Sequence, residues 1–142
     1  MKKKGFTLVE LLAVIAILAI LVIMALPAVL NMFTQARIDT FENEVKTVYR
    51  TAQQNYLLNG GAAVNYGSSG ATGCTKQLDL TGNNKLHYSI KIDGSGKVTS
   101  LIANNETYGY SKTDSNGFSI ESIDVGTSST IKKASEATPS CN

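Results

Sequence analysis

The stretch that decides the fold is KKKGFTLVELLAVIAILAILVIMALPAVL, residues 2–30. Its last twenty residues, 11–30, carry no charge, and Pro27 alone among them disfavours a helix. As a helix that rises ~1.5 Å per residue, they would span ~30 Å, the thickness of a bilayer's hydrocarbon core. Three lysines precede the run, so the positive-inside rule keeps the N-terminus cytoplasmic and sends the rest across. The sequence therefore predicts a single-pass membrane helix.

Glu10 is a carboxylate at the start of this apolar run. A charged side chain near membrane depth costs on the order of 3 kcal/mol, so it is rarely there without a function. One interpretation is that Glu10 pairs with a cation on another copy of the chain. The alternative is that it only reaches the lipid headgroups, because it lies four residues after Phe6.

Residues 4–12, KGFTLVELL, resemble the processing motif of type IV pilins and pseudopilins. In that family a membrane aspartyl peptidase cuts after the glycine, and the new N-terminal phenylalanine is N-methylated. The resemblance implies a cut between Gly5 and Phe6, methylation of Phe6, and a role for Phe6 and Glu10 in filament assembly. It covers about the first thirty residues, and the remainder resembles the family only in general plan.

The chemistry of this motif can also be argued from the residues. Gly5 has no Cβ, so a peptidase can approach its backbone closely. Cleavage creates an α-amino group on Phe6 that is mostly cationic near neutral pH. A cation at the end of an apolar helix and an anion one turn later cannot remain unpaired in lipid. Packing beside an identical helix, displaced along the axis, would let the Phe6 nitrogen of one subunit meet Glu10 of another.

Pro27 lies inside the predicted helix, where it removes a backbone donor and clashes with the preceding turn. A kink at such a proline is well tolerated in membrane helices. In the family that the motif resembles, this proline bounds a segment that loses helical structure in the filament. Many members have a glycine eight residues earlier, whereas this chain has Ala19, a good helix former.

The helix is predicted to continue through residues 31–59 with a different character. Apolar residues recur there every three or four positions, between mixed charges, which is typical of an amphipathic helix; they are Ile38, Phe41, Val45, Val48, Ala52 and Tyr56. Asn59-Gly60-Gly61 supplies a stop. We expect this half to pack on a sheet, while residues 6–30 lie in lipid or among other copies.

Residues 60–142 are predicted to form a globular head, which makes the fold α+β. Residues 60–85 are rich in glycine and are expected to be a loop with a short strand at 77–80. Residues 86–125 are expected to form an antiparallel meander of about four strands, at 86–92, 97–103, 107–112 and 118–125. The last strand changes phase, which predicts a break near Glu121 and Ser122. Residues 126–142 are a tail rich in serine and threonine.

Cys74 and Cys141 are the two cysteines, and both follow the apolar run. An oxidising exterior favours a disulfide between them. Two free thiols, or a bridge between subunits, are the alternatives.

Other function classes find little support in the sequence. Without the three leader lysines the chain has ten basic and eleven acidic side chains, and no basic cluster indicates nucleic-acid binding. The single histidine, His87, has no partners at metal-site or catalytic spacing. We therefore expect no enzyme, no cofactor and no metal site, and we find no evidence for a small-molecule ligand.

A secretory signal peptide has an apolar core of about 7–15 residues and ends in small residues. The run here is longer, and Pro27 would lie beside the scissile bond. The preferred interpretation is therefore the subunit of a type IV pilus-like filament. Residues 1–5 are its leader, a membrane precursor is its first state, and a surface filament is its last. A prepilin peptidase and methyltransferase and an assembly machinery are implied by the resemblance. The alternatives are a pseudopilin of a secretion or DNA-uptake system, and a membrane-anchored binding ectodomain that does not polymerise.

Overall fold

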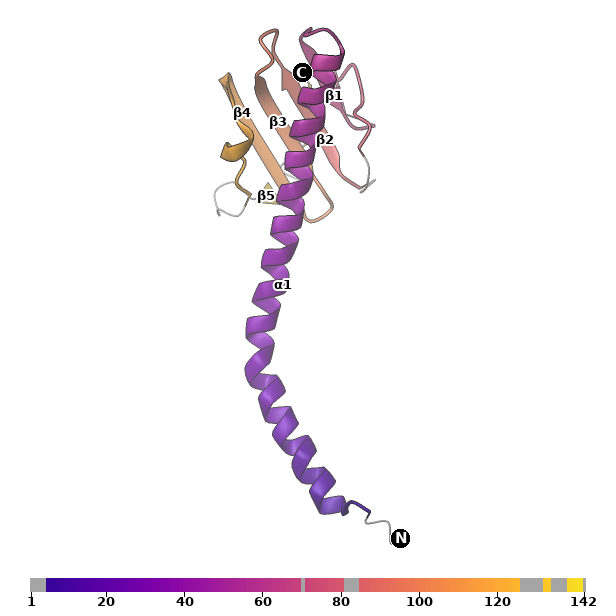
Figure 1. Cartoon of the computed structure of the whole chain (residues 1–142), viewed down its shortest axis with the longest axis vertical. Helices are drawn as coiled ribbons and strands as arrows, with labels where there is room; N and C mark the ends of the chain where they lie inside the picture. Colours follow the sequence, from indigo (N-terminus) through magenta and orange to yellow (C-terminus); the bar gives the residue numbers. More distant parts are fainter. Residues whose placement is uncertain (1–4, 70, 81–84, 126–131, 134–137, 142) are drawn as a thin grey trace. The chain divides into compact units, whose positions relative to one another are not determined.

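The computed structural model describes residues 5–69, 71–80, 85–125, 132–133 and 138–141. In chain order the elements are the helix α1 (Leu8–Leu58), the strands β1 (Val64–Gly67), β2 (His87–Ile92), β3 (Val98–Asn104) and β4 (Tyr108–Phe118), a 3-10 turn (Ile120–Ser122), and β5 (Lys132–Lys133) (Figure 1). The chain divides into two compact units, Met1–Ala36 and Arg37–Asn142. Of the predicted leader, residues 1–4 lie outside the described residues.

The long helix is confirmed, with ends close to the predicted ones. It begins at Leu8, passes through Pro27 without interruption and ends at Leu58. Gly60 and Gly61 follow with φ of 75° and 76°, a conformation that glycine adopts without the steric cost of a Cβ. The N–H of Gly61 donates to the carbonyl of Tyr56 at 3.1 Å. The Asn59-Gly60-Gly61 stop therefore acts through two left-handed glycines.

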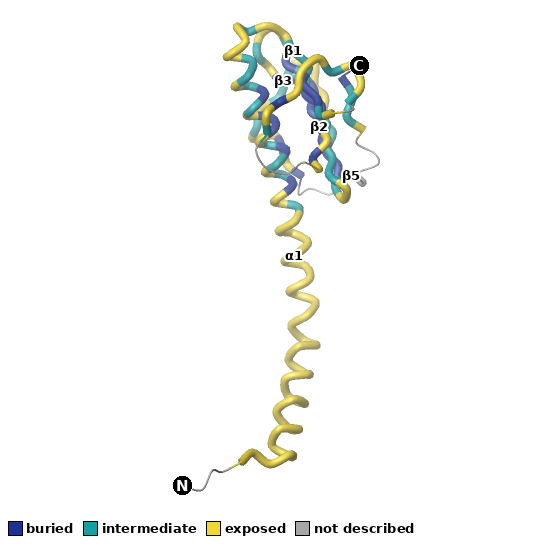
Figure 2. Tube along the Cα trace, turned by 90° about the vertical axis from the view of Figure 1, so that its right-hand side faces the viewer, coloured by how far each residue is buried: buried dark blue, intermediate teal, exposed yellow. Residues whose placement is uncertain are grey.

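In the first unit the helix buries nothing. Every described residue from 5 to 36 is exposed, as the uniform yellow of this segment in Figure 2 shows. None of the described residues from 8 to 34, which belong to the apolar part of α1, is buried by any other described part of the chain. A different surrounding, lipid or other protein, must cover this apolar part.

In the second unit the same helix packs on the sheet. The predicted stripe faces the core, because Phe41, Val45, Val48 and Ala52 are fully buried. Ile38 and Tyr56 pack at its two ends. Tyr49 also lies in the core, and its hydroxyl donates to the carbonyl of Phe118 at 2.8 Å. The helix therefore covers one face of the sheet (Figure 1).

The strands form one antiparallel sheet in the order β1-β2-β3-β4-β5. Alternate residues of β2 face the helix, since Tyr88, Ile90 and Ile92 are buried and Ile90 pairs with Leu101 on β3. The expected α+β fold, a long helix on an antiparallel sheet, is confirmed.

The strand expected at 77–80 is wrong, and the loop 60–85 contains β1 instead. Val64 pairs with Ile92 and Tyr66 with Ile90, and Tyr66 is buried. Leu78 needs no strand partner, because its N–H donates to the Tyr88 hydroxyl at 2.8 Å and its carbonyl accepts from that hydroxyl at 3.3 Å. The Tyr88 hydroxyl therefore satisfies the backbone groups of Leu78 that a neighbouring strand was expected to satisfy.

The strand expected at 118–125 is also wrong. β4 continues through residues 114–117, which were expected to lie between two strands and instead form a bulge: Thr113 pairs with Ser100, but the next partner on β3, Val98, pairs with Phe118. After Phe118 the chain leaves the sheet in the 3-10 turn Ile120–Ser122, where the change of phase predicts a break. Ile123 and Val125 are then buried without belonging to a strand.

The tail is fixed to the sheet beside the disulfide. Cys74 and Cys141 are bonded, with their Cα atoms 5.0 Å apart. The N–H of Cys141 donates to the carbonyl of Thr72 at 2.8 Å, and the N–H of Ser140 donates to the hydroxyl of Ser89 at 3.1 Å. The tail also supplies β5, which pairs with Tyr108 and Gly109. Tail residues 126–131, 134–137 and 142 lie outside the described residues.

Candidate processing and assembly site

The predicted cleavage site lies in exposed, non-helical backbone. Gly5, Phe6 and Thr7 precede the helix, and the Phe6 side chain is 89% exposed. A Cβ placed on Gly5 would meet no atom within 4 Å. No described part of the chain therefore requires a glycine here. A peptidase that approaches this backbone closely would require one.

Thr7 and Glu10 form a reciprocal cap at the start of α1. The N–H of Glu10 donates to the Thr7 hydroxyl at 3.3 Å, and the N–H of Thr7 donates to Oε2 of Glu10 at 2.8 Å. The Thr7 hydroxyl also donates to Oε2 at 2.8 Å. This is a capping box, in which two unsatisfied helix donors are bound by each other's side chains. It fixes the helix start at Leu8 and leaves the bond between Gly5 and Phe6 outside the helix.

The cap also determines how the Glu10 carboxylate is presented. Both bonds from Thr7 end on Oε2, and within the part of the chain that the structure describes Oε1 accepts no hydrogen bond. A carboxylate near a helix N-terminus is additionally favoured by the helix dipole. Glu10 is thus held by Thr7 on one oxygen, and no other described residue bonds to the second.

The sequence interpretation of this site did not include Thr7. The signal was present, because Thr7-Leu8-Val9-Glu10 fits the pattern of a threonine followed three residues later by a glutamate.

Residues 1–26 match the family model described as the prokaryotic N-terminal methylation motif. The match supports a signal of the type IV pilin and pseudopilin kind at the start of the chain. The match includes Gly5, Phe6 and Glu10 and ends within α1, so it covers the processing site and most of the apolar run. No curated protein and no solved structure matches the chain.

The prepilin signal opens a helix that is long and apolar enough to cross a membrane. By length and composition alone the helix could span a bilayer, and none of the residues in its most apolar window is buried. Together with the signal they are consistent with a membrane-anchored precursor. Pro27 follows the matched segment by one residue and lies within unbroken helix.

Proposed function

We propose that this chain is the precursor of a structural subunit of a type IV pilus-like filament. One observation carries the proposal: the helix that the prepilin signal opens has no buried residue from Leu8 to Ala36. Such a surface is unstable in water, because burying apolar area is worth roughly 25 cal/mol per Å². Lipid covers it in the precursor, and other copies of the same helix cover it in the filament.

In this proposal residues 1–5 are removed by a prepilin peptidase, and Phe6 becomes the methylated N-terminus. Residues 6–30 form the membrane anchor and later the filament core. Residues 31–59 connect this core to the head formed with residues 60–142. The exposed backbone at Gly5 and Phe6 supports cleavage at this bond.

Assembly then uses the charge that cleavage creates. The α-amino group of Phe6 in one subunit pairs with Glu10 of a neighbouring one, and this role is supported by Oε1 of Glu10, which accepts no hydrogen bond from the described residues. Contacts between two different surfaces of identical copies build an open filament when the rotation from one copy to the next does not close a ring. The assembly machinery is a partner by the same proposal, and no catalytic activity is assigned to the chain.

The decisive experiment is mass spectrometry of the N-terminal peptide from cells, combined with imaging of surface filaments in strains with and without the chain. We expect a peptide that begins at methylated Phe6 and filaments that disappear with the chain. An intact Met1, or a cut at residues 25–28, would contradict the proposal and favour a plain anchor or a secretory signal. Correct processing without surface filaments would favour a pseudopilin or a non-polymerising ectodomain.

A further inference from the structure

Three residues with a short carboxyl or amide side chain stand directly before a glycine in this sequence: Asn59, Asp93 and Asn116. In such a dipeptide the backbone nitrogen of the glycine can attack the side-chain carbonyl carbon of the residue before it, because glycine has no Cβ that hinders the approach. The attack closes a succinimide ring. In a folded protein it requires a side chain that is free to turn toward that nitrogen, so the structure distinguishes the three sites.

The Asn59 side chain is held at both of its polar atoms. Its Nδ2 donates to the carbonyl of Asn55 at 2.7 Å, and its Oδ1 accepts from Nζ of Lys76 at 3.4 Å. The backbone N–H of Asn59 donates to the same carbonyl at 3.0 Å. Turning this side chain toward the nitrogen of Gly60 would break both side-chain bonds. The fold therefore opposes ring closure at Asn59.

Asp93 is protected by its hydrogen bonds and by its charge. Its Oδ1 accepts from the N–H and the hydroxyl of Ser95, at 2.9 and 2.7 Å, and from the N–H of Lys97 at 2.9 Å. The hydroxyl of Ser95, followed by the N–H of Lys97, holds the pKa of Asp93 below its ordinary value. A carboxylate resists attack by a nitrogen nucleophile, since ring closure requires the neutral acid to lose water. Asp93 is therefore unreactive in the folded head.

Asn116 differs from both of these residues. Its side chain is exposed, and its amide group makes no hydrogen bond within the part of the chain that the structure describes. Its backbone N–H donates to Oδ1 of Asp114 at 2.9 Å. It lies in the bulge of β4, where residues 114–117 have no partner in the register with β3. Exposed side chains change rotamer within nanoseconds, so this amide can turn toward the nitrogen of Gly117 repeatedly.

The glycine that makes Asn116 reactive is required by the fold. Gly117 has a φ of 77°, a conformation that glycine adopts without steric cost, and a Cβ there would lie 2.7 Å from the Cβ of Lys97. The fold therefore fixes a reactive dipeptide in the bulge. Asn116 and Lys97 also line one pocket of about 320 Å³, so a reaction at Asn116 changes the charge of that pocket.

We propose that Asn116 is a site of spontaneous deamidation in the folded head. The nitrogen of Gly117 loses its proton and attacks Cγ of Asn116; a C–N bond forms, and the side-chain nitrogen leaves with that proton as ammonia. Water then opens the succinimide at either carbonyl, which gives aspartate or isoaspartate at position 116. Water is the co-reactant, and no oxidant or reductant is needed. The inference does not depend on the proposed filament.

The rates at the two asparagines test the proposal. The full chain, purified in detergent with its disulfide intact, is incubated in mildly alkaline buffer and digested with trypsin after reduction. Asn116 is the only asparagine or glutamine in the peptide of residues 113–132, so the mass of that peptide reports its conversion. Fragment ions of the peptide of residues 51–76 report Asn59. We expect conversion at least about tenfold faster at Asn116, which corresponds to ~1.4 kcal/mol in the barrier.

We also expect two product peptides of equal mass that separate on a column, because the succinimide opens to two isomers. An unchanged peptide of residues 113–132, or equal rates at Asn116 and Asn59, would overturn the proposal. A single product would do the same, since direct hydrolysis of the amide gives aspartate alone.

Unfolding tests whether the structure causes the difference. In guanidinium chloride with reductant Asn59 loses the bonds that hold its side chain, and both asparagines still precede a glycine. We expect the two rates to become similar. A tenfold difference that persisted in the unfolded chain would assign it to the neighbouring sequence and overturn the structural argument.

A matched pair of substitutions completes the test. Asn116→Gln should abolish the mass gain of the peptide of residues 113–132, because the longer side chain must close a larger ring, and Asn59→Gln should leave that gain unchanged. Both variants must form the disulfide. A mass gain that persisted in Asn116→Gln would overturn the assignment to this residue.

Discussion

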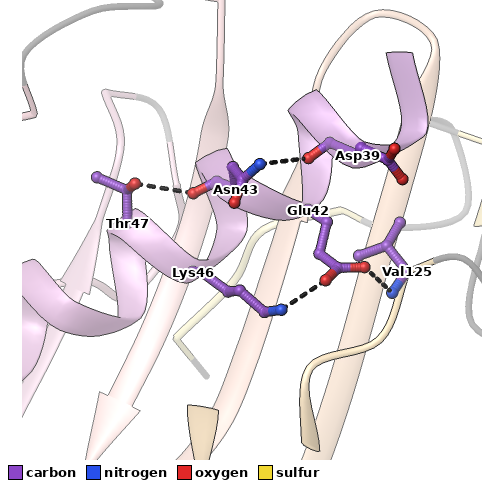
Figure 3. A network of polar contacts seen from close by, with 6 residues as sticks. All are labelled: Asp39, Glu42, Asn43, Lys46, Thr47 and Val125. Atoms are coloured by element: carbon purple, nitrogen blue, oxygen red, sulfur yellow. Dashed lines mark hydrogen bonds and ion pairs between the residues drawn. The ribbon is translucent and has the colours of Figure 1, made fainter. Parts of the chain in front are cut away.

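The Glu42 carboxylate accepts a hydrogen bond of 3.0 Å from the backbone N–H of Val125, although the two residues are 83 positions apart (Figure 3). Its other oxygen pairs with Lys46 at 2.5 Å. Val125 is fully buried and lies outside the sheet, so its N–H has no strand partner. A helix carboxylate therefore satisfies the segment that follows the 3-10 turn and fixes it against α1.

Replacing Glu42 with glutamine is expected to make the head less stable and less sensitive to acid. Glutamine can still accept from Val125 but loses the charge, a loss of about 1 kcal/mol at neutral pH. In the folded head the pKa of Glu42 lies below its ordinary 4.5, first because Lys46 donates a hydrogen bond and further because Val125 does. The extra stability of wild type over Glu42→Gln is thus fully present above pH 4.5. It is lost as the pH falls through the lowered pKa that Glu42 has in the folded head.

Thermal melting of residues 31–142 as a function of pH measures this, because the buried core lies within Arg37–Asn142. Glu106→Gln is the matched control. Glu106 also pairs with a lysine, Lys85, at 3.0 Å, but both side chains are largely exposed, and such pairs contribute little. A constant difference between wild type and Glu42→Gln at all pH values would exclude the ionic role of Glu42.

Replacing Tyr49 and replacing Tyr110 with phenylalanine are expected to have different effects on the stability of the head. The Tyr49 hydroxyl donates to the carbonyl of Phe118, whereas the buried Tyr110 hydroxyl has no hydrogen-bond partner among the described residues. Burial, with the nearby charges of Asp124 and Glu42, raises the pKa of Tyr110 to about 12. Tyr49→Phe should cost about 1 kcal/mol, and Tyr110→Phe should be neutral or stabilising, because an unpaired buried hydroxyl is unfavourable. Denaturant unfolding of both variants decides it, and equal losses would contradict the assignment.

Elements that depend on local sequence patterns were predicted correctly, and elements that depend on residues far away in the sequence were not. Helix periodicity located α1 because one face repeats every three or four residues, from Ile38 to Tyr56. Alternation located β2 and β3 for the same local reason. The strand 64–67 and the non-strand 119–125 depend on distant groups, namely pairing with β2 and the bond from Glu42. At the proposed processing site, the roles of Gly5, Phe6 and Glu10 stay predictions from the motif, and the Thr7 cap follows the local threonine-to-glutamate spacing.

Gly67→Ala is expected to destabilise the head through the disulfide. A Cβ at Gly67 would lie closer than 3.0 Å to the Cys74 side chain and to the Ala71 Cβ. Forcing an added methyl into such a site typically costs 1–3 kcal/mol. Gly94→Ala is the control, because a Cβ there meets nothing within 4 Å. If thermal melting shows equal losses for both variants, the close contact at Gly67 has no energetic weight.

Loss of the disulfide is expected to lower the melting temperature of the head by many degrees. The bond joins residues 67 positions apart, and constraining a loop of that length in the unfolded chain is worth roughly 4 kcal/mol. Cys141→Ser should also speed hydrogen exchange at Ser140 and position 141, whose N–H groups bond to Ser89 and Thr72. Two titratable thiols in oxidised protein, or melting unchanged by reductant, would refute this tether.

The two roles of Glu10, helix cap and charge partner, can be separated by two substitutions. Glu10→Gln keeps the cap, because glutamine also serves at this position of a capping box, but it removes the charge that would pair with the Phe6 amine of a neighbour. Thr7→Val keeps the charge and the shape but loses the hydroxyl that bonds to Glu10, at a cost of about 1 kcal/mol to the helix start.

If the ion pair controls assembly, Glu10→Gln should abolish or strongly reduce filaments, since an unpaired buried cation costs on the order of 3–5 kcal/mol. Thr7→Val should then retain most of them. Sheared filaments, normalised to membrane-inserted protein, give the measurement, and Glu10→Ala should be at least as defective as Glu10→Gln. Should Thr7→Val fail to polymerise while Glu10→Gln succeeds, the cap and not the charge would be what assembly requires. The interaction of Glu10 with its own chain would then take the place of the proposed pairing between subunits.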